Sequence, residues 1–234
     1  MKPLQYLFRS FLILSFVLFF TSCSSDEIVV SEENGTLTQR QNLVNSFEKT
    51  GVVYKQIYDT YRFNSGDSLL SIQQIILEVE KTATQVPDFV ALQNSYTPID
   101  TLIIGSIVFD QAITVKDYIH DSILSPHAQQ LFISLTDSLH QNTTGNSLNL
   151  IIDFEFRVMQ DIQLTTLDKE IMLTSCSIMR YNLDNGGDTD WSDQNNGIMK
   201  STLVGMQEHT TKAIIMAVVV QVVVQQYVAI DLQN

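Results

Sequence analysis

Residues 213–230 read AIIMAVVVQVVVQQYVAI, and this stretch decides which folds are open to the chain. It carries no charge over 18 residues and is interrupted only by Gln221, Gln225 and Gln226. We interpret it as the central buried helix of a helical bundle, with Gln221 and Gln225 one turn apart on a wetter face. The three glutamines disfavour a stable membrane span.

Two other structures stay open for 213–230. Its length is close to the roughly 20 residues that cross a bilayer, so it could insert into a membrane as a helix or a hairpin. Its seven valines also suit a buried pair of strands, although no turn signal divides the stretch. Working outward, the apolar pattern begins earlier, and we expect one long final helix from Ile198 to Ile230.

The preceding segments also predict helices. Thr165-Thr166-Leu167-Asp168 matches a capping box for a helix that runs to Asn182. Ser125-Pro126 is a second start signal, with serine as N-cap and proline at the first helical position. Apolar residues at helical intervals predict further helices over 38–62, 69–79 and 148–162, with a kink near Gly51, a cap at Asp67 or Ser68, and Leu43, Val44, Leu69 and Ile162 on the apolar faces.

The segment Leu102 to Phe109 (LIIGSIVF) is apolar and rich in β-branched residues. It suits a buried strand or a helix, and periodicity alone does not choose between them.

The N-terminus has the pattern of an export signal. Lys2 and Arg9 precede the apolar run FLILSFVLFF at 11–20, which is too short to cross a bilayer, and the small residues Thr21 and Ser22 follow. Phe20-Thr21-Ser22-Cys23 resembles the lipobox of bacterial lipoproteins, although Phe20 stands where leucine is usual. The resemblance implies cleavage before Cys23 and lipidation of that cysteine, and two acyl chains already anchor a protein stably.

Residues 24–38 (SSDEIVVSEENGTLT) have the composition of a flexible tether. The stretch Ser24-Ser25-Asp26-Glu27 is similar to the serine-then-acid signals that send lipoproteins of Bacteroidota to the outer face of the outer membrane. It is equally typical of a polar tether, so periplasmic and surface orientations both stay open.

Charge excludes some partners. Removal of Lys2 and Arg9 leaves 11 basic and 26 acidic residues in the 212 residues from Cys23 onward, a formal net charge of −15. We therefore expect no nucleic-acid partner, and no electrostatic attraction to an anionic bilayer.

Together these features predict a mainly α protein: a signal peptide over 1–22, a lipidated tether over 23–38, and one bundle-like domain of six to seven helices over 39–234.

Few residues suggest chemistry. The loop 184–197 (DNGGDTDWSDQNNG) holds Asp184, Asp188, Asp190 and Asp193, which are weak candidates for a calcium site. An EF-hand that starts at Asp188 would need glycine at 193 and glutamate at 199, where Asp193 and Met199 stand, so a solvated loop is the better interpretation. Trp191 is interpreted as a residue that pins this loop to the body.

The remaining candidates favour structural roles. Cys176 lies in an apolar helical stretch, where a buried hydrophobe is the expected role. Glu155 stands alone between Phe154 and Phe156, and one acid is not a general acid/base pair. The histidines are scattered, with no metal-binding spacing, and no cofactor motif is found; they are His120, His127, His140 and His209.

The stretch from Thr166 to Trp191 carries a resemblance to a known family. Thr166-Leu167-Asp168-Lys169-Glu170-Ile171-Met172 and Ser177-Ile178-Met179-Arg180-Tyr181 resemble the capped, small-residue helix of small helix-rich lipoproteins of Bacteroidota, in which a tryptophan near a loop follows. The likeness covers about a third of the mature chain, and in the last helix valine largely replaces the family's glycine and alanine. The resemblance implies a helical fold and a location at the cell envelope, but no activity.

The sequence therefore predicts an exported, membrane-anchored lipoprotein of the cell envelope that acts as a non-enzymatic module for an unidentified protein or glycan partner. The alternative is a membrane-active effector that inserts 213–230 into a target bilayer. A third hypothesis, a hydrolase with dispersed catalytic residues, would need a pocket with convergent polar groups.

Overall fold

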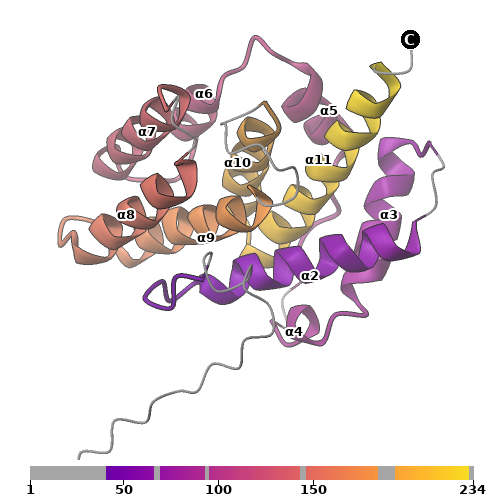
Figure 1. Ribbon diagram of the computed structural model, residues 1–234, viewed down its shortest axis with the longest axis horizontal. Coiled ribbons are helices and arrows are strands. Elements are labelled where there is room, and N and C mark those ends of the chain that lie inside the picture. Colours follow the sequence, from indigo (N-terminus) through magenta and orange to yellow (C-terminus); the bar gives the residue numbers. More distant parts are fainter. Residues whose placement is uncertain (1–40, 66–68, 93–94, 143–145, 184–192, 232–234) are drawn as a thin grey trace, which may run out of the picture. The chain divides into compact units, whose positions relative to one another are not determined.

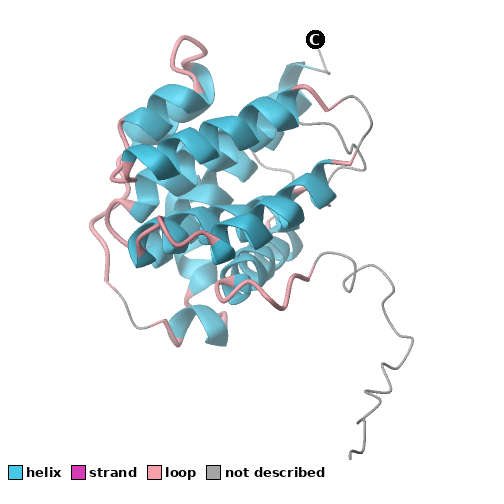
Figure 2. Ribbon diagram, turned by 90° about the vertical axis from the view of Figure 1, so that its left-hand side faces the viewer, coloured by secondary structure: helices cyan, strands magenta, loops and turns pink. Residues whose placement is uncertain are grey.

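A computed structural model describes residues 41–65, 69–92, 95–142, 146–183 and 193–231, the side chains of 193–194 and 228–231 excepted. The described residues all lie in one compact unit, Leu37–Asn234. They form ten helices and no strand (Figures 1 and 2), which confirms the helical class and exceeds the expected number of six to seven. The helices are α2 (Glu48–Asn64), α3 (Ile72–Ala83), α4 (Pro87–Val90), α5 (Thr101–Phe109), α6 (Val115–His120), α7 (Pro126–His140), α8 (Ser147–Gln160), α9 (Thr166–Asn182), α10 (Asp193–Met206) and α11 (Thr210–Asp231).

Two helices form the centre of this body. Every residue of α9 from 171 to 182 is buried, and so is every residue of α11 from 213 to 223. A helix that is apolar on all sides needs partners on all sides, and α11 packs against α10, α3, α2 and α5. The interpretation of this stretch as a core helix is therefore confirmed for residues 213–223, and its helical structure excludes the strand pair.

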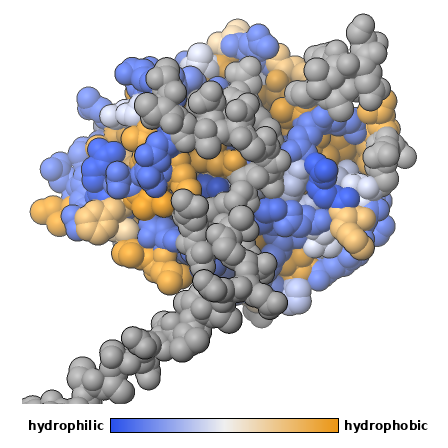
Figure 3. Space-filling model, viewed as in Figure 1, coloured by the Kyte–Doolittle hydropathy of each residue, from blue (hydrophilic) through white to orange (hydrophobic). Residues whose placement is uncertain are grey.

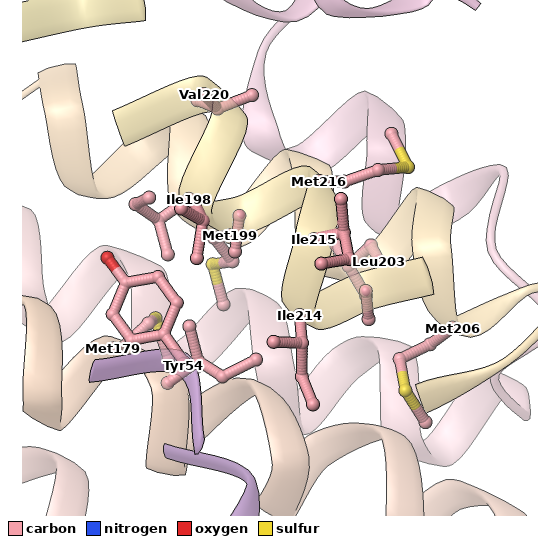
Figure 4. Close-up of a cluster of buried hydrophobic side chains, with 14 of the residues drawn as sticks. Tyr54, Met179, Ile198, Met199, Leu203, Met206, Ile214, Ile215, Met216 and Val220 are labelled. Carbon is pink, nitrogen blue, oxygen red and sulfur yellow. The ribbon is translucent and has the colours of Figure 1, made fainter. Parts of the chain in front are cut away.

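The expected long helix from Ile198 to Ile230 is wrong, because the chain turns back at Gln207–His209 and separates α10 from α11. The two helices pack along each other, and Figure 4 shows Ile214 and Ile215 of α11 beside Leu203 of α10. A Cβ atom on Gly205 would lie 2.3 Å from the Ala213 Cα, so only glycine permits this approach. The turn lets the apolar surfaces of both halves bury each other.

The predicted helix starts are confirmed at Thr165 and Ser125. The side chain of Thr165 accepts from the Asp168 amide, and Asp168 Oδ2 accepts from the Thr165 amide and hydroxyl at 3.0 and 2.7 Å. Asp168 also accepts from the amide and hydroxyl of Ser125 at 2.8 and 2.9 Å. Burial raises the pKa of Asp168, but these hydrogen bonds outweigh it and the net pKa is lowered. One carboxylate thus joins the starts of α7 and α9.

The start of the body differs from the expected amphipathic helix over 38–62. Helix α2 begins only at Glu48, and residues 41–47 form turns. Leu43 and Val44 are exposed, whereas Asn42 and Asn45 are buried, which reverses the expected apolar face. The reason is that the two amide side chains find a buried partner on α8, as the next section describes.

Gly51 lies inside the continuous helix α2 and marks its crossing with α9. Its amide donates to Ser177 Oγ at 3.0 Å, and a Cβ atom there would lie 2.4 Å from the same oxygen. A larger residue would therefore push the two helices apart.

Three other expectations are corrected or placed. Leu102 to Phe109 belongs to helix α5, whose N-cap is Asp100, and the strand alternative is excluded. Leu69 and Ile162 are exposed at 68% and 96%, because neither lies within a helix. Asp67 and Ser68 lie outside the described residues, and Ser71 forms the capping box of α3 with Gln74.

Candidate functional site

Five of the residues that the sequence singled out lie outside the described part of the chain. These are Cys23, Asp184, Asp188, Asp190 and Trp191. Asp193 is the first residue of α10, and its side chain is not described. Among the described residues there is no group of three or more side chains that could hold a metal ion. Lipidation at Cys23 thus stays a prediction, and so does the interpretation of 184–197 as a solvated loop in preference to a calcium site.

The four histidines lie at separate places in the fold. His120 closes α6, and His127 Nε2 lies 2.8 Å from Asp161 Oδ2. His140 Nδ1 lies 2.8 Å from the Thr136 carbonyl oxygen, within α7. His209 Nδ1 accepts from the Thr211 amide at 3.2 Å at the start of α11. The His127 contact joins α7 to the end of α8, whereas the contacts of His140 and His209 lie within a few residues of each histidine, and no two of the four histidines are brought together by these contacts.

A cavity of about 570 Å³ lies between the α5–α6 connection, α7 and α10. No sequence pattern indicated it, since its walls come from segments far apart in the chain. Apolar side chains and charged or amide groups both line it. The apolar ones are Ile107, Val108, Ile113 and Val115, and the polar ones include Asp110, Gln111, Lys116, Asp137, His140, Asn196 and Lys200.

Lys200 is the most deeply placed charge in this cavity. It is 7% exposed, its Nζ donates to the Ile113 carbonyl oxygen at 2.5 Å, and the same Nζ lies 5.5 Å from the centre of the Tyr118 ring. A buried ammonium group is tolerated only with such partners. Lys200 therefore fixes the α5–α6 connection to α10 and brings a positive charge to the cavity.

The charges around the cavity balance. Lys116 Nζ lies 2.7 Å from Asp137 Oδ1, and both side chains are about half exposed. Asp110 accepts from the Ala112 amide at 3.0 Å at the opposite wall. Two ammonium and two carboxylate groups thus face one space in an otherwise acidic body, which suits a ligand that carries both charges or neither.

A second polar assembly is fully buried and does not line the cavity. Arg180 on α9 is 0% exposed, and its Nε donates to Glu155 Oε1 on α8 at 3.1 Å. Its Nη1 donates to Glu48 Oε1 on α2 at 3.3 Å, its Nη2 donates to Glu48 Oε2, and the Tyr181 hydroxyl donates to Glu48 Oε1 at 2.9 Å. We call Glu48, Glu155 and Arg180 the ionic core.

The ionic core also holds the segment that precedes α2. Asn42 Nδ2 donates to Glu155 Oε2 at 2.6 Å, and Asn45 Nδ2 donates to Glu155 Oε1 at 2.7 Å. Burial raises the pKa of Glu155, and the nearby Arg180 and the two amides offset this only in part. Each group has partners within the protein, so the ionic core joins α2, α8 and α9 and is a structural feature.

The two glutamines of α11 that the sequence places on a wetter face differ in their surroundings. Gln221 is 0% exposed and accepts from the hydroxyl of Tyr54, whose hydroxyl also lies 2.9 Å from Asn182 Oδ1, so the expectation is wrong for Gln221. Gln225 is half-buried and accepts from the Tyr58 hydroxyl at 2.6 Å and from Arg62 Nη1 at 3.2 Å. Both glutamines face tyrosines of α2, which satisfy their side-chain oxygens.

Cys176 is buried, as predicted. Burial, together with the charge of Glu155, raises the pKa of its thiol well above the ordinary value. The thiol therefore stays protonated at neutral pH, which is unfavourable for a nucleophile.

Comparison with protein-family models, curated proteins and solved structures found no match.

Proposed function

We propose that this chain is an exported lipoprotein whose helical body is a non-enzymatic binding module at the cell envelope. The observation that carries the binding role is the cavity of about 570 Å³ beside α10. Its size lies within the range of roughly 300–1,000 Å³ that small-molecule sites occupy. Its lining is more polar than that of most such sites, because charged and amide side chains outnumber the apolar ones, and this favours a polar ligand.

The lining indicates the class of ligand. Lys116 and Lys200 provide ammonium groups, whereas Asp110 and Asp137 provide carboxylates. A zwitterionic or neutral polar molecule with an apolar part matches both features, whereas a multiply charged anion would face the carboxylates. Free amino acids, short peptides and small sugars belong to the matching class.

Binding can be tested with probes of that class. We expect one pool among free amino acids, tripeptides and disaccharides to raise the melting temperature of the purified protein, because a ligand that binds only the folded state stabilises it. Gln111→Trp should abolish the shift, because Gln111 lines the cavity and is exposed enough to accept a larger side chain. Gln73→Trp on the exposed side of α3 is the matched control.

Two results would argue against a binding site in this cavity. One is the absence of a shift with all three probe classes at millimolar concentration. The other is a shift that survives in Gln111→Trp as fully as in Gln73→Trp, which would place the ligand elsewhere.

The proposed location at the cell envelope rests on the N-terminal sequence. Fractionation of cells that express Cys23→Ala and metabolic palmitate labelling of the native protein test it together. We expect the native protein to take up label and to stay with membranes after a high-salt wash, and the variant to do neither. Protease treatment of intact cells then distinguishes the surface orientation from the periplasmic one.

The effector alternative has less support. The segment Thr210–Tyr227 is long and apolar enough to cross a membrane, but 67% of it is buried inside the body. Insertion would have to separate α11 from α10, α3 and α2, against which it packs.

A further inference from the structure

Two large apolar residues are exposed where the chain enters the body. Leu43 and Val44 are 84% and 64% exposed, although the neighbouring Asn42 and Asn45 are only 8% and 2% exposed. Both asparagines are held inside by Glu155, and this arrangement forces the intervening apolar pair outward. The outward orientation is therefore fixed by buried hydrogen bonds.

The surface of α8 next to this segment is also apolar. Phe156 is 51% exposed and Ile152 is half-buried. Successive helical residues are about 100° apart, so Ile152 and Phe156 lie about 60° and about 100° round the helix from Glu155, on the side away from the core. Both residues lie within one helical turn of Glu155, whose carboxylate accepts hydrogen bonds from Asn42 and Asn45. We call Leu43, Val44, Ile152 and Phe156 the entry patch, and Figure 3 shows apolar residues at the left and lower left of the body.

We propose that the entry patch rests on the lipid bilayer that carries the acyl chains of Cys23. The inference depends on the proposed lipidation, because Leu43 lies only 20 positions after Cys23. Even when fully extended, a chain of that length reaches at most about 70 Å. With Cys23 lipidated, the patch therefore stays within that distance of the bilayer, and its contact with lipid becomes an intramolecular event.

Tethering explains why so few side chains suffice. Three exposed apolar side chains and one half-buried one are too few for stable binding from solution, but a short tether raises the effective concentration of the surface to the millimolar range. The acidic body disfavours anionic lipid, so the contact requires neutral headgroups. The result is one fixed orientation, in which the ends of α2 and α8 that flank the patch face the membrane.

The experiment places a fluorescent probe in the patch. The mature chain is coupled through Cys23 to a maleimide phospholipid in phosphatidylcholine vesicles, and Cys176, which is 0% exposed, does not compete. Leu43→Trp carries the probe, and Leu77→Trp is the control. Leu77 is 55% exposed on α3. Burial and the charge of Glu78, the next residue, raise the pKa of Tyr61, which lies near the end of α2 opposite to the patch. Leu77 therefore lies away from the patch (Figure 1).

Brominated acyl chains then quench tryptophans that touch lipid. Because interfacial side chains lie about 5–10 Å into the headgroup boundary, we expect the emission added by Leu43→Trp to fall about twofold. The emission added by Leu77→Trp should not change, after subtraction of the Trp191 signal of the unsubstituted chain. Leu43→Trp that is mixed with vesicles but not coupled should show no quenching.

Three outcomes would overturn the proposal. Equal quenching of Leu43→Trp and Leu77→Trp would mean that the patch has no preference for lipid. If the protein self-associates in sedimentation experiments and Val44→Asp abolishes the association, the patch binds a second copy of the chain. The Leu43→Trp probe could also be shielded from aqueous acrylamide when no vesicles are present. If Val29→Asp removes that shielding, the patch is covered by residues 28–30 of the tether. The chemical anchor keeps this test separate from the lipidation test, since absent palmitate labelling would overturn only the latter.

Discussion

Arg180 balances two buried carboxylates, and its loss should be the most damaging single change in the ionic core. Arg180→Met would leave Glu48 and Glu155 without their counter-charge in the interior. Removal of one partner from a buried ion pair costs about 3–5 kcal/mol, so we expect the free energy of unfolding to fall by that amount. Urea denaturation followed by far-UV circular dichroism measures it.

Arg157→Met is the matched control. Arg157 is an exposed residue of α8, and its guanidinium lies 5.5 Å from the centre of the Phe154 ring. Its loss should cost no more than about 1 kcal/mol, the size of an exposed cation–π contact. Equal losses in the two variants would show that the ionic core contributes nothing special to stability.

Glu155 should give the folding equilibrium a distinct dependence on pH. Burial raises the pKa of Glu155 in the folded state, so the folded state holds this proton more tightly than the unfolded chain does. The contribution is most favourable below the unfolded pKa of about 4.3 and is lost as pH rises through the folded pKa. Glu155→Gln should remove this decline.

The measurement is the free energy of unfolding at a series of pH values from the unfolded pKa upward. The difference between the native protein and Glu155→Gln should change steadily with pH, in favour of the variant as pH rises. A difference that stays constant over this pH range would contradict a raised pKa at Glu155.

At the scale of elements, the α10–α11 hairpin depends on Gly205. An alanine there would place its Cβ 2.3 Å from the Ala213 Cα and 2.5 Å from the Ala213 nitrogen, and backbone atoms cannot move aside as side chains do. Overpacking typically costs about 1–3 kcal/mol, and we expect Gly205→Ala to lie at the upper end of that range. The hairpin would separate, and the melting temperature would fall.

Gly105 provides a control of opposite sign. It lies within α5, and a Cβ atom there would meet nothing within 4 Å. Alanine in a helix interior is more stable than glycine by roughly 0.5–1 kcal/mol, so Gly105→Ala should raise the melting temperature. Calorimetry of both variants tests the pair, and a neutral Gly205→Ala would mean that α10 and α11 do not approach so closely.

The elements that could be predicted from the sequence are those with local signals. The capping box from Thr165 to Asp168 and the start at Ser125-Pro126 depend on spacings of one to three residues, and both are confirmed. The break between α10 and α11 was missed because no proline or glycine stands at Gln207–His209. The polar run from 207 to 210 within apolar sequence was the available signal.

The contacts that hold the elements together could not be predicted in this way. Glu155 and Arg180 are 25 residues apart and pair only because α8 and α9 are neighbours in space. The cavity is likewise formed by side chains from the α5–α6 connection, α7 and α10. Long-range pairing of this kind has no periodicity within one segment, so a single sequence does not reveal it.

For the whole molecule, the position of α11 determines whether the protein can act on membranes. Residues 213–223 are all buried, and insertion into a bilayer would expose the apolar surfaces of α10, α2 and α3 that cover them. Each buried aliphatic side chain contributes roughly 1.5–3 kcal/mol, so the loss over the eight isoleucine, methionine and valine side chains of 213–223 would reach or exceed the usual stability of a domain. A bilayer would compensate only for the inserted helix and not for the partners left behind.

We therefore expect the purified, unlipidated chain to release no dye from phosphatidylcholine vesicles at neutral pH, measured by the fluorescence of an encapsulated self-quenched dye against full release by detergent. Gln221→Leu makes the segment more apolar and removes one of the two hydrogen-bond partners of the Tyr54 hydroxyl, so this variant should insert more readily if α11 inserts at all. If α11 inserts, this variant should release dye faster than the native chain. If α11 is only a core helix, neither protein releases dye, and Gln221→Leu changes the melting temperature alone. Release by both, faster for Gln221→Leu, would replace the binding module with the effector.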